Sequence, residues 1–185
     1  MSEYFIDREK KINLLLSYQK DQAVSFIINY ISDEDPFVRA EALLVLNNIN
    51  NKSLYMHITP SLKDDDHHVR YSAADALGKL KSLDSSKDLI EAFDDNSEFV
   101  QCKIIDSLGK IHSEYSSDFL MSKLYDKNQI IRDEVHLALE NMIDYDICEK
   151  RLVKFFEEDN TREEVFDQLY KMLHISQKYK NTFNC

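Results

Sequence analysis

The stretch of sequence that decides the fold is DDDHHVRYSAADALGKL, residues 64–80. Its apolar residues follow the spacing i, i+4, i+7, i+8 and i+11, which places them on one face of an α-helix. These residues are Val69, Ala73, Ala76, Leu77 and Leu80. Asp66 stands just before them, and its carboxylate can accept hydrogen bonds from the free N–H groups of a first helical turn. The stretch therefore predicts one amphipathic helix over residues 67–80.

The same pattern returns every 31 residues along the chain. Apolar columns are formed by Val38, Val69, Val100 and Ile131, by Leu46, Leu77, Leu108 and Leu139, and by Ile49, Leu80, Ile111 and Met142. Residues suited to cap the helix recur as Asp35, Asp66, Ser97, Asn128 and Asp159. A second amphipathic segment precedes each of these helices. Self-similarity at a period of this length indicates a tandem repeat whose unit is a pair of helices.

We therefore expect an all-α fold, an α-solenoid of about five to six 31-residue helix-pair repeats over residues 1–174. The best-matching repeats span residues 33–143. A partial first repeat supplies its second helix at 3–18, a degenerate capping repeat covers 145–174, and residues 175–185 form a polar, weakly basic tail. Helices are expected near residues 3–18, 21–31, 36–49, 53–63, 67–80, 85–94, 98–111, 115–125, 129–142, 146–157 and 161–174.

Glycine is scarce in this chain, with two residues in 185. The phosphate-binding loops of dinucleotide-binding folds and P-loop proteins need glycine, so this scarcity counts against both classes. The two glycines, Gly78 and Gly109, lie 31 residues apart at one position of the repeat. A glycine inside a helix lowers stability by up to about 1 kcal/mol relative to alanine. Its use at this position indicates either a close approach of two helices or a helix C-terminal turn.

The chain is acidic, with a formal net charge of -11. Residues 171–185 contain three lysines and no acid, so residues 1–170 carry all 34 acidic side chains against 20 basic ones. Nucleic-acid binding requires clustered basic side chains, so it is not expected, and a basic protein partner is favoured. No apolar run is long enough for a membrane span. The N-terminal residues lack a secretory signal pattern, and the three scattered cysteines suggest reduced thiols and a cytoplasmic location. We also expect a monomer in isolation.

Residues 64–80 resemble the HEAT-like repeat, specifically the short type named after the phycobilisome lyases. DEDPFVRAEALLVLNNI (33–49), DNSEFVQCKIIDSLGKI (95–111) and KNQIIRDEVHLALENMI (127–143) are successively weaker versions. The likeness implies stacked helix pairs whose second helices line a concave groove. It also implies a structural ladder in which a turn acid and an arginine link neighbouring repeats. The ladder residues would be Asp33, Asp64, Asp95 and Asp126 with Arg39, Arg70 and Arg132, while Gln101 would make the third link neutral and weaker.

The side chains of the repeats offer little for metal binding or catalysis. Residues 64–68, DDDHH, contain possible metal ligands, but Asp64 and Asp66 have structural roles, and His67 and His68 point about 100° apart on a helix. The HEAT-like enzymes that hydroxylate a modified lysine hold iron with His-Glu pairs, and this chain has no His-Glu dipeptide. HEAT-like DNA glycosylases use a basic groove, whereas this chain is acidic and lacks tryptophan. We expect no catalytic residue, no metal and no cofactor.

The partner-binding surface is expected on the second helices, at positions rotated away from the buried columns. These positions are Ala40, Tyr71, Cys102 and Asp133; Glu41, Ser72, Lys103 and Glu134; and Leu44, Asp75, Asp106 and Leu137. Tyr71, Leu44 and Leu137 are apolar anchors of the type that dominate protein interfaces. Glu41, Asp75, Asp106 and Glu134 would meet positive charge on the partner. This surface is therefore predicted to be a mixed acidic and apolar groove.

Two functions from different classes remain open on the sequence alone. The first is a non-catalytic protein-interaction module, for example an inhibitor or immunity-type protein whose acidic groove blocks a basic toxin. The second follows from the resemblance to the phycobilisome-lyase group and is a chromophore lyase or chaperone for a bilin-type pigment. A DNA-glycosylase function is disfavoured by the acidic charge.

Overall fold

The computed structural model describes residues 3–17, 24–49 and 51–142 of the chain. Over these residues the chain forms nine α-helices, two short 3-10 segments and no strand. The α-helices are α1 (Glu3–Ser17), α2 (Val24–Tyr30), α3 (Pro36–Asn47), α4 (Tyr55–Ile58), α5 (His67–Leu80), α6 (Ser85–Glu91), α7 (Glu98–Ile111), α8 (Glu114–Ser122) and α9 (Gln129–Met142). This all-α arrangement confirms the predicted fold class.

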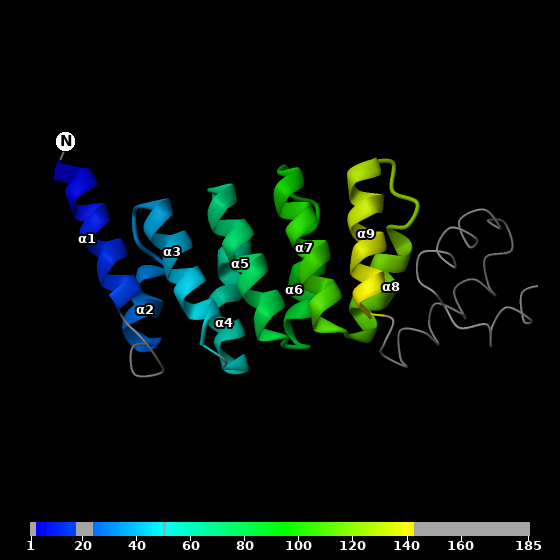
Figure 1. Cartoon of the computed structure of the whole chain (residues 1–185), viewed down its shortest axis with the longest axis horizontal. Helices are drawn as coiled ribbons and strands as arrows, with labels where there is room; N and C mark the ends of the chain where they lie inside the picture. The colour runs from blue at the N-terminus through cyan, green and yellow to red at the C-terminus, as the bar shows by residue number, and fades with distance from the viewer. Residues whose placement is uncertain (1–2, 18–23, 50, 143–185) are drawn as a thin grey trace, which may run out of the picture.

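The helices form two layers (Figure 1). The odd-numbered helices α1, α3, α5, α7 and α9 stand side by side, each packed on the next, and the even-numbered helices form the other layer. The odd-numbered helices are the second helices of the repeats, so we call them the second-helix layer. Helix pairs that stack in this way form an α-solenoid, which is the architecture of the described residues.

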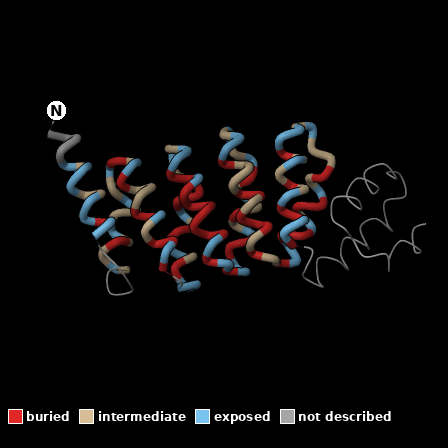
Figure 2. The backbone as a smooth tube through the Cα atoms, in the orientation of Figure 1, coloured by how far each residue is buried: buried red, intermediate tan, exposed pale blue. Residues whose placement is uncertain are grey.

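The core lies where the two layers and their successive repeats meet (Figure 2). The first apolar column of the repeat is fully inside it: Val38, Val69, Val100 and Ile131 are all 2% exposed or less. Leu46, Leu77, Leu108 and Leu139 are completely buried. The 31-residue periodicity therefore identified the buried face of α3, α5, α7 and α9.

Helix boundaries follow local chemistry. Asp35, Asp66 and Asn128 each accept a hydrogen bond from the backbone N–H two residues on, which satisfies a free donor of the first helical turn. Ser97 occupies the N-cap position of α7, but its side chain accepts no such bond, so the prediction of a serine cap there is wrong. Asp159 lies outside the described residues.

The region 53–63 is not the single helix that was predicted. It divides into a 3-10 segment at Lys52–Leu54, the one-turn helix α4 and a second 3-10 segment at Thr59–Lys63. Pro60 has no N–H to donate to the carbonyl group four residues earlier, and its ring crowds that carbonyl. The chain therefore tightens into 3-10 geometry at the proline. The helices predicted at 146–157 and 161–174, the capping repeat and the tail lie outside the described residues.

Candidate functional site

The turns that enter the second helices share one construction. In each, the carboxylate of an aspartate accepts a hydrogen bond from the backbone N–H two residues later, at 2.8–2.9 Å. These aspartates are Asp33, Asp64, Asp95 and Asp126. A side chain that closes its own turn in this way fixes the direction in which the next helix starts. The regular 31-residue spacing of these acids therefore has a local cause, in addition to any contact between repeats.

An arginine of one repeat reaches the turn aspartate of the next. Arg39 donates from Nε and Nη2 to both carboxylate oxygens of Asp64, at 2.8 and 2.7 Å. Arg70 does the same with Asp95, at 2.6 and 2.8 Å, and its Nη1 donates to the carbonyl oxygens of Asp64 and Asp65. These two forked ion pairs are the part of the Asp–Arg ladder that the described chain contains.

The ladder is altered at both ends. At the N-terminal end Asp33 pairs with Lys11 at 3.0 Å, and Arg8 pairs with Asp35. Toward the other end, Gln101 donates its amide to the carbonyl oxygen of Phe93, within its own repeat. We expected a neutral link from Gln101 to Asp126, and within the described chain that link is not made.

Asp126 nevertheless keeps its turn-closing bond to the N–H of Asn128. Arg132 donates to the carbonyl oxygen of Asp126, as Arg39 and Arg70 do in their own turns, and it also donates to Gln129. The position at which a following repeat would meet Arg132 lies outside the described residues.

The two carboxylates of the forked ion pairs, Asp64 and Asp95, are held ionised. Burial alone would raise the pKa of Asp95, but the hydrogen bond from Arg70, the N–H of Ser97 and the arginine charge lower it below its ordinary value. Burial would likewise raise the pKa of Asp64, but the hydrogen bonds from Arg39 and from the N–H of Asp66, together with the charges of Arg39 and Arg70, lower it below its ordinary value. The ion pairs therefore persist at neutral pH.

The two glycines lie where neighbouring second helices touch. A Cβ on Gly78 would come within 2.6 Å of Ser107 Oγ and 2.8 Å of Ser107 Cα on the next helix. A Cβ on Gly109 would come within 2.9 Å of Ala138 Cβ. Of the two explanations offered by the sequence, close helix approach is the one observed. The left-handed residues that end these helices are Lys81 and His112, also 31 residues apart.

The residues predicted to line a groove lie on the face of the second-helix layer that turns away from the core, which we call the second-helix face. Leu44, Tyr71 and Leu137 are exposed there, by 39%, 38% and 52%. Glu41, Lys103, Asp106 and Glu134 are partly buried, and so are Ala40 and Cys102, whereas Asp133 is exposed. Ser72 and Asp75 are buried, so the prediction that these two residues are exposed to a partner is wrong.

Asp75 belongs to an ion network in the centre of this face. Lys79 and Lys103 approach its carboxylate at 2.9 and 3.4 Å, and the amide of Asn47 donates to it at 3.1 Å. Lys103 also pairs with Asp106 at 2.8 Å, and Lys110 pairs with the same oxygen at 2.7 Å. Three lysines therefore neutralise the two central carboxylates that were expected to meet a basic partner.

The network keeps its members charged. Burial opposes ionisation of Asp75 and Asp106, but their lysine partners lower both pKa values. Burial also disfavours the charged form of Lys103, yet Asp106 and Asp75 raise its pKa above the ordinary value. Next to this network, burial and repulsion from Asp106 raise the pKa of Glu134. Unneutralised acidity on this face is thus confined to its ends.

Sequence reasoning missed a row of exposed side chains at the N-terminal ends of the second helices. The row consists of Phe37, His68, Phe99 and Ile130, which occupy the second position of α3, α5, α7 and α9. Phe37, Phe99 and Ile130 are 53%, 77% and 51% exposed. The signal was present in the sequence, because these residues are 31 apart and each directly precedes the buried valine or isoleucine of its helix. We call this set, which consists of three apolar side chains and one histidine, the apolar row.

The catalytic and metal-binding alternatives meet little support in the side-chain geometry. Asp64 binds Arg39, and Asp66 caps α5. The rings of His67 and His68 pack against each other, with their centres 4.0 Å apart. The described part of the chain contains no group of three or more His, Cys, Asp or Glu side chains placed so that they could bind one metal ion. Burial, Glu134 and Glu98 raise the pKa of the Cys102 thiol, which makes it a poor nucleophile at neutral pH.

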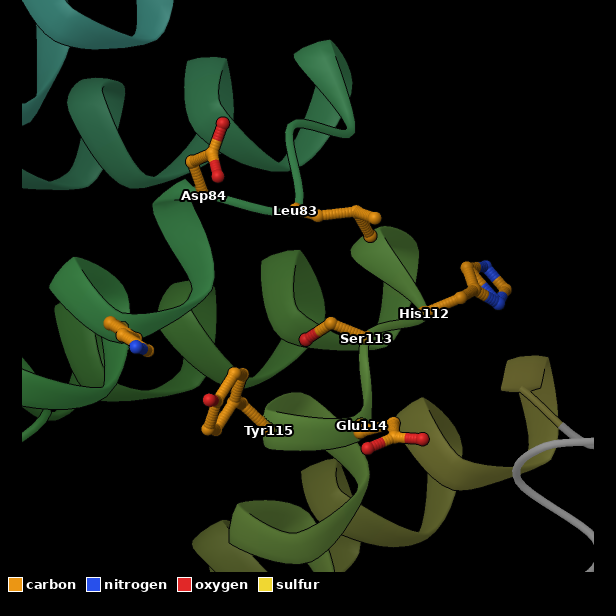
Figure 3. A pocket seen from close by; sticks show the side chains of 7 residues that line it. Leu83, Asp84, His112, Ser113, Glu114 and Tyr115 are labelled. Carbon is orange, nitrogen blue, oxygen red and sulfur yellow. The ribbon is translucent and has the colours of Figure 1, made fainter.

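A shallow pocket of about 390 Å³ lies at the opposite ends of the second helices, between the turns that follow α5 and α7. Its lining includes Leu83, Lys87, His112 and Tyr115, and the ammonium group of Lys87 sits 4.7 Å from the centre of the Tyr115 ring. Figure 3 shows the His112 ring directed away from Tyr115. These groups do not converge on one point, so the pocket lacks the arrangement of a catalytic site. Among the described helices, none combines the length and apolarity needed to cross a bilayer.

Comparison with known proteins agrees with this architecture. A family model for HEAT repeats matches residues 24–101 and 55–140. The fold is similar to human deoxyhypusine hydroxylase in complex with glycerol (TM-score 0.59, 20% identity, 67% of this chain and 44% of that one). It is also similar to the complex of CpcE and CpcF of phycocyanin lyase from Nostoc (TM-score 0.62, 17% identity, 83% of this chain and 65% of that one). An engineered protein matches with a TM-score of 0.53 at 17% identity, covering 83% of this chain and 79% of its own.

The chain spans less than two thirds of the length of the first two of these structures. No curated protein sequence matches it. At these identities the likeness shows the fold.

Proposed function

Since the chain belongs to the HEAT-repeat family, we propose that it is a non-catalytic interaction module that binds a partner protein through its second-helix face. The observation that carries the proposal is the set of exposed apolar side chains on that face. Leu44, Tyr71 and Leu137 project from three different repeats, and the apolar row runs beside them. Exposed apolar side chains spread over several repeats suit an extended protein surface better than a small metabolite.

The charges on this face indicate where a partner would carry positive charge. Asp75 and Asp106 are neutralised by lysines of the same face, so a basic partner would meet acid at the two ends, at Glu41 and at Glu134. The whole chain is acidic, which favours encounter with a basic surface over long range. A basic toxin or enzyme held in check by an inhibitor or immunity-type protein fits this description. We further propose that the module acts in the cytoplasm and is a monomer without its partner.

The test is affinity capture from a lysate of the source organism at low and at high salt. The bait is the wild-type chain, the Leu44→Glu and Leu137→Glu double variant, or a Met56→Glu control. Met56 is 67% exposed on α4, in the other helix layer, so its replacement leaves the second-helix face unchanged. We expect a protein that is retained by the wild type and the control at low salt and lost with the double variant. Equal capture by all three baits, or none at low salt, would refute the proposal.

The chromophore-lyase alternative shares this fold and makes a different prediction. Incubation with a bilin should shift the pigment's absorbance if the chain holds it without another protein. An unchanged spectrum, together with strict dependence on a protein partner, would favour the interaction module.

A further inference from the structure

The apolar row is the most exposed apolar feature of the second-helix layer. Phe99, at 77% exposed, is the most exposed large apolar side chain among the described residues. Phe37 is covered in part by the guanidinium of Arg8, 4.5 Å from its ring centre, and it stacks on His68 with ring centres 6.4 Å apart. The first two members of the row therefore form a continuous aromatic surface, to which an arginine already adds a cation–π contact.

The row is bordered by acid. The four turns that lead into α3, α5, α7 and α9 (residues 31–35, 64–66, 92–97 and 123–128) contain nine carboxylates and two lysines. Arg8, Lys11, Arg39 and Arg70 reach into the first three turns and pair with four of these acids. The fourth turn contains Asp126 with Lys123 and Lys127, and Arg132 donates to the carbonyl oxygen of Asp126. The exposed carboxylates beside the row are therefore those of the first three turns, Glu34, Asp65 and Asp94. A segment lying on the row would thus find apolar contacts beneath it and negative charge along one side.

The dimensions of the row favour a helix as its occupant. Packed helices are about 8–10 Å apart, so the three steps from Phe37 to Ile130 cover roughly 27 Å. A helix of about 18 residues has this length at 1.5 Å per residue. The row is made of side chains from four separate helices, and the described residues contain no sheet edge with which an extended strand could pair. A helix satisfies its own backbone and needs only an apolar stripe and flanking charge.

We infer that the apolar row, with the acidic turns beside it, binds an amphipathic basic helix of about 18 residues. This inference rests on the proposed function and names the partner element that the second-helix face would take. The apolar stripe of the helix, with a residue at every third or fourth position, would lie on Phe37, His68, Phe99 and Ile130. Its lysines or arginines would lie toward Glu34, Asp65 and Asp94.

The probe is a fluorescein-labelled 18-residue peptide with leucines on one helical face and lysines elsewhere, titrated with the whole chain and followed by anisotropy. Two matched peptides have the same charge: one has its leucines scrambled around the helix, and one has two central prolines. We expect saturable binding of the first peptide, and binding at least tenfold weaker for each of the others. Absence of saturable binding, or equal binding of either control peptide, would overturn the inference.

Variants of the chain locate the site. Removing two apolar side chains of the row, by Phe99→Ser and Ile130→Ser, should weaken binding at least tenfold. Removing two exposed apolar side chains elsewhere, by Met56→Ser and Leu83→Ser, should change it less than twofold; these residues are 67% and 62% exposed. Equal effects of the two double variants would overturn the inference.

The same variants separate this inference from the proposed function. If a captured partner is lost with Leu137→Glu but retained with Phe99→Ser and Ile130→Ser, the interaction module stands and the apolar row is not its helix site. If the partner is retained by all variants while the peptide still binds the row, the row is a helix site and the proposed second-helix face fails.

Discussion

Replacing Arg70 by alanine tests how successive repeats are held together. The Arg70 and Asp95 side chains are 10% and 6% exposed, and the guanidinium makes two charged hydrogen bonds to Asp95, one to Asn96 and two to carbonyl oxygens of its own turn. Removing one partner of a buried ion pair leaves the other charge uncompensated, which costs about 3–5 kcal/mol. We expect the lower part of this range, about 3 kcal/mol, because Asp95 keeps its bond from the N–H of Ser97.

The chain supplies a matched control at the same position of the next repeat. Gln101 makes one neutral hydrogen bond of 3.2 Å, so Gln101→Ala should cost about 0.5–1.5 kcal/mol. For a chain of this size 1 kcal/mol corresponds to roughly 2–4 °C in Tm, so Arg70→Ala should lower Tm by about 6–12 °C. Urea and thermal unfolding followed by circular dichroism measure both variants, and the helix content of the folded state should not change.

A double-mutant cycle assigns the loss to the pair. In a chain that already carries Asp95→Ala, the further change Arg70→Ala should cost much less, because the charge that it strands has been removed. An apolar pair, Arg70→Met with Asp95→Leu, should recover part of the stability that Arg70→Met alone loses. The reasoning is refuted if Arg70→Ala and Gln101→Ala lower stability equally, or if the loss is the same with and without Asp95.

Two further predictions concern helix contacts and pH. Gly78→Ala should lower the free energy of unfolding by about 1–3 kcal/mol despite the higher helix propensity of alanine, because the new methyl group would meet the backbone of Ser107 at 2.8 Å. Gly109→Ala, whose nearest contact is 2.9 Å, should cost less. A gain in urea midpoint for Gly78→Ala would contradict this expectation. Because the folded-state pKa values of Asp64 and Asp95 lie below their unfolded values, their contribution to stability is present above the ordinary aspartate pKa and is lost as pH falls through the folded-state values. Urea midpoints measured from pH 6 to pH 2 should therefore fall on the acid side, and less steeply in Arg70→Ala; parallel curves would show that the ion pair does not contribute.

Much of the fold could be predicted because the sequence repeats it. Val38, Val69, Val100 and Ile131 each face the same environment in successive units, so one periodic column identified the buried side of four helices. The exception at 53–63 has a local cause, since one proline interrupts a pattern whose apolar spacing is otherwise helical. Ser97 shows a second limit, because a residue type that can cap a helix does so only when its side chain turns toward the free N–H groups.

The interaction face was harder to predict, because helical periodicity gives the direction of a side chain and not its depth. Leu44, Asp75 and Leu137 occupy the same position of the repeat, yet Leu44 and Leu137 are exposed and Asp75 is buried. The depth at Asp75 is set by its neighbours. Gly78, one turn further on, lets α5 and α7 approach closely, and Lys103 of α7 then extends over the Asp75 carboxylate.

This packing changes where a partner would gain its binding energy. A charge reversal at Asp75 would first break the pairs with Lys79 and Lys103, so any loss of binding it caused would report on the fold of the face as much as on the partner. Phe99 has no comparable role, because most of its surface is in solvent and its removal leaves the core columns intact. A loss of binding in Phe99→Ser with an unchanged unfolding midpoint would therefore report on the partner alone. The exposed apolar residues, more than the acids at the centre of the face, are the positions at which recognition can be tested without disturbing the solenoid.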